Sequence, residues 1–182
     1  MQFDSTAFEG LTVITPKVFG DDRGYFFESY NHQSLKQVGL NFDWVQDNQS
    51  HSSYGVIRGL HFQKNPSAQT KLVRVLQGEI LDVVVDLRKD QTTYGKVYSI
   101  VLSADNKQQL LVPRGFAHGF SVLSETADVM YKCDALYDKQ SEAGICYNDP
   151  TLAIDWKIPM DKVNVSEKDV ILPGFADCDT NF

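Results

Sequence analysis

The chain has 182 residues, of which 42% are hydrophobic and 23% are charged, and its formal net charge is −7 at pH 7. These proportions are typical of a single folded domain with a substantial core and exclude an intrinsically disordered chain. The negative net charge argues against general binding to nucleic acids or to anionic membranes, so an anionic ligand would need a local basic pocket.

The cysteines and the N-terminus indicate the compartment. Cys133, Cys146 and Cys178 are an odd number and form no Cys-x-x-Cys pair, which favours a reducing compartment over a disulfide-stabilised fold. The first residues lack the basic and apolar regions of a signal peptide, and no run of 18 apolar residues predicts a membrane span. We therefore expect a cytoplasmic protein that binds neither nucleic acid nor membrane.

The first predicted element in chain order is a short helix over 32–38, with Asn31 as its N-cap and Gly39 at its end. Short strands separated by turn residues follow, over 72–76, 80–87, 96–102, 110–112, 119–123 and 129–137. A second short helix is predicted to begin at Ser166. This order predicts an all-β sandwich or barrel in one domain, with any small-molecule site in its mouth or cavity.

The predicted strand over 80–87 has two different faces. One face is wholly apolar and is formed by Leu81, Val83, Val85 and Leu87, whereas the other carries Asp82 and Asp86. We expect the acidic face to line a polar cavity or to meet solvent. The N-terminal aromatic residues are expected to lie in the core, namely Phe19, Tyr25, Phe26 and Phe27.

Five residues are candidates for chemistry. Arg58 and His61 lie three residues apart in a short β-like run, His118 lies in a glycine-rich stretch predicted to be a loop, and Tyr131 lies in a predicted strand. Histidine is the usual base for removing a proton from carbon beside a ketone, and Lys71 could stabilise the enolate that forms. Tyrosine keeps its proton at pH 7 and could return one to the opposite face, while arginines could clamp phosphates.

Each candidate also has a purely structural interpretation. A histidine on a strand is more often a satisfied structural residue than a base, His118 could cap a turn, and Tyr131 could pack with its hydroxyl group at the rim. Arg58 and Lys71 could be solvated charges on strands. Asp169 fits a helix-capping pattern after Ser166, which alone would explain it.

Taken together, the motifs resemble those of one known family. They occur in order and nearly from end to end, in the segments Arg23–Glu28, Gln46–Asn48, Arg58–His61, Gln69–Val75, Pro113–Phe120 and Ser166–Asp169. They are similar to the motifs of the dTDP-4-dehydrorhamnose 3,5-epimerases, metal-independent enzymes of the cupin, or jelly-roll, superfamily. The resemblance implies a jelly-roll sandwich or barrel with a few short peripheral helices, an isomerase activity, and no metal or other cofactor.

The resemblance also implies a role for each catalytic residue. His61 would remove the C3 and C5 protons of dTDP-4-dehydro-6-deoxy-D-glucose, and Asp169 would pair with this histidine. Tyr131 would deliver a proton from the opposite face, and Lys71 would stabilise the enolate formed from the C4 ketone. The product would be dTDP-4-dehydro-L-rhamnose, a precursor of surface polysaccharide.

Substrate contacts are implied at eight further positions. These are Arg23 and Arg58 at the pyrophosphate, Glu28, Gln46 and Asn48 at the nucleotide or sugar, His118 at the sugar, and Glu142 and Lys168 as additional contacts. Members of the family are similar to one another in forming homodimers, often with exchange of N-terminal strands. Here the exchanged part would lie within about 1–30, with Leu11–Pro16 as the candidate strand. The core would span about 40–150, and the segment 151–182 would pack on it.

The chain departs from the family pattern in its C-terminal part. Tyr147 stands where a tryptophan is expected, and Lys157-Ile158 separates Trp156 from Pro159, where members often have Trp-Pro directly. These departures bear on the local geometry around Asp169, and they would also fit a different nucleotide sugar.

Three alternatives to the 3,5-epimerase stay open. The nearest is an enzyme that inverts only C3 or only C5, or that acts on another dTDP-4-keto sugar. A metal-dependent cupin oxygenase or isomerase is less favoured, because the residues two positions after His61 and His118 are Gln63 and Phe120 rather than metal ligands. Neither His32 nor His51 completes a ligand set. A non-catalytic module that binds a sugar nucleotide is the third alternative.

Overall fold

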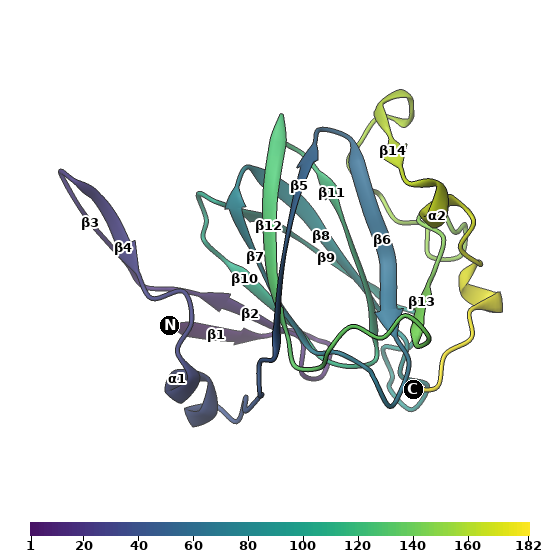
Figure 1. Ribbon diagram of the computed structural model, residues 1–182, viewed down its shortest axis with the longest axis horizontal. Helices are drawn as coiled ribbons and strands as arrows, with labels where there is room; N and C mark the ends of the chain where they lie inside the picture. The colour runs from purple at the N-terminus through teal and green to yellow at the C-terminus, as the bar shows by residue number, and fades with distance from the viewer.

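Two β-sheets face each other in the computed structural model, which describes residues 1–182 (Figure 1). The first sheet has the order β1 (Gln2–Ser5), β2 (Thr12–Thr15), β10 (Gln109–Val112), β7 (Lys71–Gln77), β12 (Thr126–Cys133) and β5 (Gln46–Ser53). The second has the order β13 (Glu142–Gly144), β6 (Val56–Gln63), β11 (Phe116–Val122), β8 (Glu79–Asp86) and β9 (Val97–Ser103), with β14 (Asn164–Val165) parallel to β6. The predicted all-β sandwich is confirmed.

A hairpin and four short helical segments lie outside these sheets. The hairpin pairs β3 (Val18–Asp21) with β4 (Gly24–Phe27), and the helical segments are α1 (His32–Gln37), η1 (Met160–Lys162), α2 (Glu167–Val170) and η2 (Phe175–Asp177). Both predicted helices are confirmed together with their caps. The Asn31 side chain accepts a hydrogen bond from the Ser34 amide at 3.0 Å, and the Ser166 hydroxyl accepts one from the Asp169 amide at 3.1 Å. None of the helices has the length and apolar character needed to traverse a bilayer.

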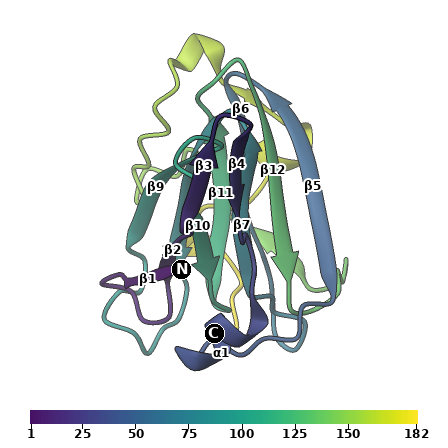
Figure 2. The same cartoon turned by 90° about the vertical axis from the view of Figure 1, so that its left-hand side faces the viewer.

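The β3–β4 hairpin forms an arm that extends away from the sandwich (Figure 1). Figure 2 views the molecule from the side of this arm, with β3 and β4 in front of the sheets. Phe19, Tyr25 and Phe26 are 54%, 64% and 70% exposed on this arm, so the expectation that they belong to the core is wrong. Two lysines cover part of this surface, since Lys107 Nζ lies 4.3 Å from the centroid of the Tyr25 ring and Lys17 Nζ lies 5.0 Å from that of Phe19. Only Phe27, at the base of the arm, is half-buried, and its ring centroid lies 5.6 Å from the Arg74 guanidinium carbon.

The main core fills the space between the two sheets. Its members include Val73 and Val129 from the first sheet and Val84 and Phe120 from the second, all buried. Alternation along each strand explains this packing, since every second side chain of a strand points to the same face. Burial of these apolar side chains is the main source of stability for such a sandwich.

A second core lies on the outer side of the second sheet, beneath the C-terminal segment. It contains the wholly apolar face of β8 together with Leu152 and Trp156, and the partly buried Phe175 and Phe182 pack against it. The other face of β8 turns into the sandwich. Asp82 and Asp86 on that face are completely buried, so the expectation that they meet solvent is wrong, and they are not among the residues that line the two cavities described below.

Several strands differ from the prediction, and three of them bear on the site. β11 begins at Phe116, so His118 lies on a strand and not in a loop. β12 ends at Cys133, four residues before the predicted end. β5 carries the sequence Gln46–Ser53 and was not predicted as a strand, because it has no apolar face: one side faces the cavity and the other meets solvent.

Candidate active site

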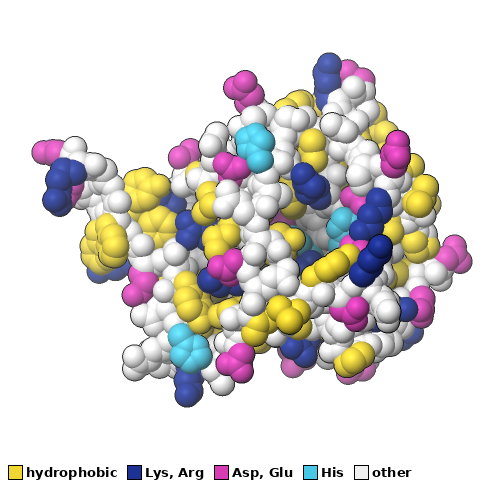
Figure 3. All heavy atoms as spheres, viewed as in Figure 1, with side chains coloured by type: hydrophobic (Ala, Val, Ile, Leu, Met, Phe, Trp, Pro, Cys, Tyr) yellow, Lys and Arg dark blue, Asp and Glu magenta, His cyan; other side chains and the backbone are white.

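A cavity of about 460 Å³ is bounded by strands of both sheets and by α2. A second cavity of about 290 Å³ adjoins it, and the two share His61, Lys71 and Tyr131 in their walls. Figure 3 shows a hollow on this face of the molecule, with lysine, arginine and histidine side chains around it. The two cavities together form a continuous candidate site with the three chemistry-bearing residues at its centre.

Ten of the twelve predicted site residues line these cavities. Seven line the larger cavity, namely Arg58, His61, Lys71, His118, Tyr131, Lys168 and Asp169, and three more line the smaller one, namely Gln46, Asn48 and Glu142. The remaining two, Arg23 and Glu28, do not. Arg23 lies on the arm and Glu28 directly follows it, and both are exposed to solvent.

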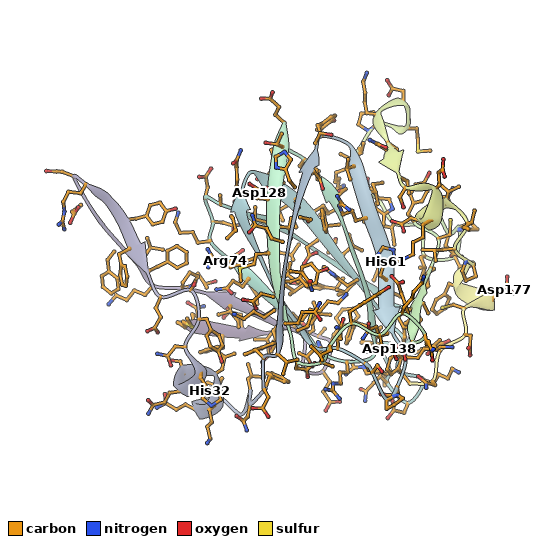
Figure 4. All side chains as sticks on the ribbon, viewed as in Figure 1. His32, His61, Arg74, Asp128, Asp138 and Asp177 are labelled. Atoms are coloured by element: carbon orange, nitrogen blue, oxygen red, sulfur yellow. The ribbon has the colours of Figure 1, made fainter.

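The central pair of the site is His61 and Asp169. His61 Nε2 lies 2.7 Å from Asp169 Oδ1, and the aspartate is buried whereas the imidazole is partly open to the cavity. Figure 4 shows the position of His61 on β6. An Nε2–H donated to a carboxylate leaves Nδ1 with the lone pair, so Nδ1 is the basic atom of this histidine. The helix-capping interpretation of Asp169 accounts only for its backbone, because its carboxylate binds His61.

The electrostatics of Asp169 favour its charged form. Burial acts to raise the pKa of this carboxyl, but the hydrogen bond and charge of His61 outweigh burial, helped by the backbone N–H of Gly59 and by Ser166, and the pKa is lowered. The Gly59 amide donates to Asp169 Oδ2 at 3.2 Å. Asp169 is therefore a carboxylate at neutral pH, suited to stabilise an imidazolium on His61.

Lys71 projects from β7 into the junction of the two cavities. Burial lowers the pKa of its ammonium group, with opposition from Cys133, Asp82 and Glu142. It forms no ion pair, and its Nζ lies 5.7 Å from the centroid of the Tyr131 ring. The interpretation of Lys71 as a solvated strand charge is wrong, because its ammonium group lies inside the site, where a developing anion would be its partner.

Tyr131 reaches the cavity from β12, on the sheet opposite His61. Burial raises the pKa of its phenol, with a further contribution from Cys133 and opposition from Arg58. The hydroxyl group accordingly carries its proton at neutral pH. Because β12 and β6 belong to facing sheets, the phenol and the imidazole approach the cavity from opposite sides.

A second histidine–aspartate pair lies beneath the first. His118 pairs in register with His61 across β11 and β6, and its Nε2 lies 2.6 Å from Oδ1 of the buried Asp82. The turn-capping interpretation of His118 is therefore wrong. Asp82 Oδ2 has no hydrogen-bond partner within the chain, so His118 is the only side chain that forms a hydrogen bond with this carboxylate.

Charged residues surround the entrance. Arg58 is exposed, and its Nε donates to the Ser52 hydroxyl at 3.0 Å. Glu142 links α2 to the loop after β12 at this entrance. Lys168 Nζ donates to its Oε1 at 2.6 Å, and the Tyr137 hydroxyl donates to its Oε2 at 2.9 Å. Burial acts to raise the pKa of Glu142, but these two hydrogen bonds outweigh it and the pKa is lowered.

Several residues of the site were missed in the sequence. Asp82 was noted only as part of an acidic strand face, and Tyr137 gave no signal because it lies in the loop after β12. The other unpredicted wall residues are Ser50, Val56, Ile57, Phe62, Gln63, Gln69, Gly119, Phe120, Asn164 and Ser166. Tyr147, Lys157 and Ile158, where the chain departs from the family pattern, line neither cavity.

The arrangement is suited to proton transfer at carbon. It offers a histidine with a carboxylate behind it, a protonated phenol on the opposite wall, and a lysine beside the phenol ring. No set of three or more His, Cys, Asp or Glu side chains is grouped as it would be around a metal ion. His51 instead lies 2.8 Å from Asp128, on the outer face of the first sheet.

Fold and site together define an isomerase class, in which a β-sandwich cavity moves protons at carbon beside a carbonyl group. The family model for dTDP-4-dehydrorhamnose 3,5-epimerase matches residues 5–177. The chain belongs to this epimerase family and is an isomerase of dTDP-sugar biosynthesis.

Individual relatives are similar to this chain over almost its whole length. The dTDP-4-dehydrorhamnose 3,5-epimerase of Shigella flexneri is 46% identical over 180 residues, covering 98% of each chain. The crystal structure of the Elizabethkingia anophelis enzyme has a TM-score of 0.93 at 53% identity and covers 97% of both chains. The epimerase of Legionella pneumophila, solved in complex with dTDP-4-keto-L-rhamnose, has a TM-score of 0.93 at 44% identity, covering 98% of this chain and 94% of its own.

Proposed function

We propose that this chain epimerises dTDP-4-dehydro-6-deoxy-D-glucose at C3 and C5, with His61 as the base and Tyr131 as the acid. The product is dTDP-4-dehydro-L-rhamnose. The observation that carries the assignment is the position of these two side chains, which enter one cavity from facing sheets. Inversion requires proton removal on one face of the sugar and proton delivery on the other, and one group cannot do both.

Proton removal follows from the His61–Asp169 pair. Nδ1 of His61 takes the proton from C3 or C5, the C–H bond breaks, and its electron pair moves through the carbon–carbon bond to the C4 oxygen. The imidazolium that forms lies next to the Asp169 carboxylate, which stabilises the positive charge. The C4 oxygen becomes an enolate, and the Lys71 ammonium supplies the positive charge that this oxygen needs.

Proton delivery completes each inversion. Tyr131 donates its hydroxyl proton to the carbanion carbon from the opposite face, the enolate collapses to the ketone, and a phenolate remains. The phenolate regains a proton from solvent, and His61 releases its own, before the second carbon reacts. The raised pKa of Tyr131 supports this role, because it ensures that the group begins each cycle protonated.

The rim fits an anionic nucleotide despite the net charge of −7. Arg58 and Lys168 supply cations on two sides of the larger cavity, while Gln46, Asn48 and Glu142 offer polar contacts in the smaller one and His118 lies beside the sugar position. The epimerase of Bacillus anthracis was solved with TDP and pyrophosphate bound, which supports a dTDP-linked ligand here. The three free cysteines fit the reducing cytoplasm in which we expect the reaction.

The working form is proposed to be a homodimer. Arg23 and Glu28 resemble substrate contacts of the family but lie on and beside the arm, away from their own chain's cavity. The arm also exposes Phe19 and Phe26, as a segment that packs against another subunit would. In the single chain β2 pairs with β1 and β10. The exchange of Leu11–Pro16 therefore stays a prediction, and the arm is an equally direct route to the second subunit.

Inversion at one carbon only is the second candidate. The observation that favours it is a likeness to ChmJ, a 3′-monoepimerase of Streptomyces bikiniensis solved with dTDP-quinovose, with a TM-score of 0.88 at 28% identity. The match covers 95% of this chain and 87% of that one. ChmJ was also crystallised as a double mutant in which a histidine became asparagine and a tyrosine became phenylalanine. The identity to the 3,5-epimerases is much higher, which favours inversion at both carbons.

The deciding experiment follows the substrate by NMR in deuterated water, with and without a chelator. Deuterium at both C3 and C5 with inverted ring geometry, unaffected by the chelator, supports the 3,5-epimerase. Deuterium at one carbon selects the monoepimerase, and loss of exchange on chelation revives a metal-dependent cupin. No exchange at all points to another sugar nucleotide or to a binding module. His61→Ala should abolish exchange with the fold intact, and normal turnover by that variant would disprove the mechanism.

A further inference from the structure

The side chains of Arg58 and His61 line the same cavity, although in a regular strand residues at this spacing would point to opposite faces. Both line the larger cavity, yet residues three apart in a strand point to opposite faces. Ile57 and Leu60 show the same anomaly on the other side, since both pack in the outer core. β6 must therefore contain one extra residue between Arg58 and His61.

The pairing of β6 with β11 locates that residue. The two strands pair in one register at His61 and in another, shifted by one residue, at Arg58. Gly59 and Leu60 consequently lie opposite the single residue Gly119. This is a β-bulge, a feature that re-aims side chains and frequently lies beside active sites.

Two glycines make the bulge sterically feasible. A Cβ atom on Gly119 would lie 2.6 Å from the carbonyl oxygen of Arg58, and one on Gly59 would lie 2.7 Å from both the Gly119 Cα and the His118 carbonyl oxygen. Gly59 also has a φ of +114°, which L side chains rarely adopt. A side chain at either position would push the two strands apart at the level of the catalytic pair.

The bulge also supplies a hydrogen bond to Asp169. The peptide between Arg58 and Gly59 turns its carbonyl group toward Gly119 and its N–H away from it, and that N–H donates to Asp169 Oδ2 at 3.2 Å. Asp169 here fills a gap at Arg58 and Gly59, because β14 pairs with β6 only as far as Ile57, while β13 and the following Ile145 bind the β6 backbone from Leu60 onward. A peptide unit is planar, so displacement of its oxygen displaces its N–H as well.

We propose that Gly59 and Gly119 are positioning residues of the active site: their contact holds the bulge that turns His61 into the cavity and aims the Gly59 N–H at Asp169. The inference rests on the roles proposed above for His61 and Asp169. It assigns a function to two residues without side chains, of which Gly119 also contributes backbone to the wall of the larger cavity.

The acid limb of the pH–rate profile should report this positioning. The His61–Asp169 pair carries one negative charge until it takes up a proton, and the Gly59 N–H stabilises that charged form. Loss of the N–H raises the proton affinity of the pair, so the acid limb moves to higher pH. The other charged or titratable groups that face the pair stay unchanged, namely Arg58, Lys71, His118 with Asp82, Tyr131, Glu142 and Lys168.

The test is Gly119→Ala, since Gly119 has no positive φ and the tightest contact of an added Cβ is the Arg58 carbonyl oxygen at 2.6 Å, followed by Leu60 Cδ2 at 3.2 Å and the Gly59 Cα at 3.3 Å. We expect kcat to fall about 100-fold with a smaller change in KM, and the acid limb of kcat/KM to move to higher pH. Gly174→Ala is the control, because Gly174 also has no positive φ and an added Cβ would lie 2.9 Å from Asp149 Oδ2, outside both cavities. A folded Gly119→Ala variant with wild-type kcat and an unmoved acid limb would overturn the proposal.

A second measurement uses the wild-type chain and does not depend on folding of the variant. Labelling with ¹³C-carbonyl arginine and ¹⁵N-glycine makes only the three Arg–Gly peptides visible by NMR, which are Arg23–Gly24, Arg58–Gly59 and Arg114–Gly115. One of the three amide signals should shift as the His61–Asp169 pair titrates, and this shift should vanish in Asp169→Asn. If no signal behaves in this way, the Gly59–Asp169 link is wrong. This readout needs no turnover, so it separates failure of the link from failure of the proposed function.

Discussion

His61 Nε2 and Asp169 Oδ1 lie 2.7 Å apart although 108 residues separate them in the chain. The contact forms because α2, whose N-cap is Ser166, lays its first turn against β6 at the bulge. The carboxylate fixes one imidazole tautomer and leaves Nδ1 toward the cavity. Both the basicity of His61 and its orientation therefore depend on a residue in the C-terminal segment.

Asp169→Asn should reduce kcat by about 100-fold or more, because the amide cannot stabilise an imidazolium. The fold should survive, since the cap of α2 uses the backbone N–H of residue 169 and not its carboxylate. The measurement is kcat together with the melting temperature. Asp179→Asn is the control, since Asp179 is exposed and pairs only with Lys64. A folded Asp169→Asn enzyme with more than half of the wild-type kcat would contradict the assignment.

Tyr131→Phe should separate the two halves of the reaction. Removal of the hydroxyl group leaves His61 able to abstract protons, so deuterium should still exchange into the substrate, while the inverted product forms about 100-fold more slowly. NMR in deuterated water measures both quantities in one sample. Tyr147→Phe, outside both cavities, should leave both rates unchanged. Equal losses of exchange and inversion would show that Tyr131 is not mainly the acid.

Lys71→Met should lower the activity of the enzyme and raise the stability of its fold. Burial lowers the pKa of Lys71, so the folded state holds this proton less tightly than the unfolded chain and the charge destabilises the fold at neutral pH. Methionine removes that cost, and the melting temperature at pH 7 should rise. Loss of the cation should lower kcat about 100-fold. Lys132→Met, on the outer face of the first sheet beside Asp47, should change kcat little. A fully active Lys71→Met enzyme would remove Lys71 from the mechanism.

Much of this architecture could be predicted from local sequence. The caps at Asn31 and Ser166 and the alternating face of β8 are short-range patterns with a direct physical cause, and the structure contains all three. The motifs that contain His61, Lys71 and Tyr131 led to residues that lie together in one site. Local signals were sufficient wherever the periodicity of a strand or the chemistry of a cap determined the outcome.

The remainder depends on contacts between distant parts of the chain. A strict two-residue period would send Arg58 and His61 to opposite faces, and only the pairing with Gly119 reveals the extra residue. β5 has no apolar face, so no hydrophobic pattern could identify it. Phe26 was expected in the core because it is aromatic, but it lies on the arm and is 70% exposed, and no local pattern distinguishes an exposed aromatic residue from a buried one.

The proposed dimer predicts complementation between two inactive chains. Arg23→Ala should weaken binding and His61→Ala should abolish proton transfer, so each variant alone has little activity. If the arm of one subunit completes the site of the other, a heterodimer contains one site with both residues intact. An equal mixture, unfolded and refolded together, should recover about a quarter of wild-type activity. Sedimentation of the mixture checks that dimers form. A mixture no more active than its components would place Arg23 in its own chain's site or outside any site.

The last prediction concerns acid stability. Asp169 and Glu142 both have pKa values below their ordinary range, so the folded state binds these protons more weakly than the unfolded chain. The stability they contribute is fully present above the unfolded carboxyl pKa of about 4 and is lost as the pH falls below it. The wild-type melting temperature should therefore change little between pH 7 and pH 5 and drop steeply below about pH 4.

The double variant Asp169→Asn/Glu142→Gln should show a shallower drop, because it carries neither carboxyl group, and it should begin from a lower melting temperature at pH 7. Asp105→Asn is the matched control, since the exposed carboxylate of Asp105 makes no ion pair. Calorimetry from pH 7 to pH 3 gives all the curves. Parallel curves for the double variant and the wild type would mean that these two carboxylates do not stabilise the fold, and that the contact between α2 and β6 rests on packing alone.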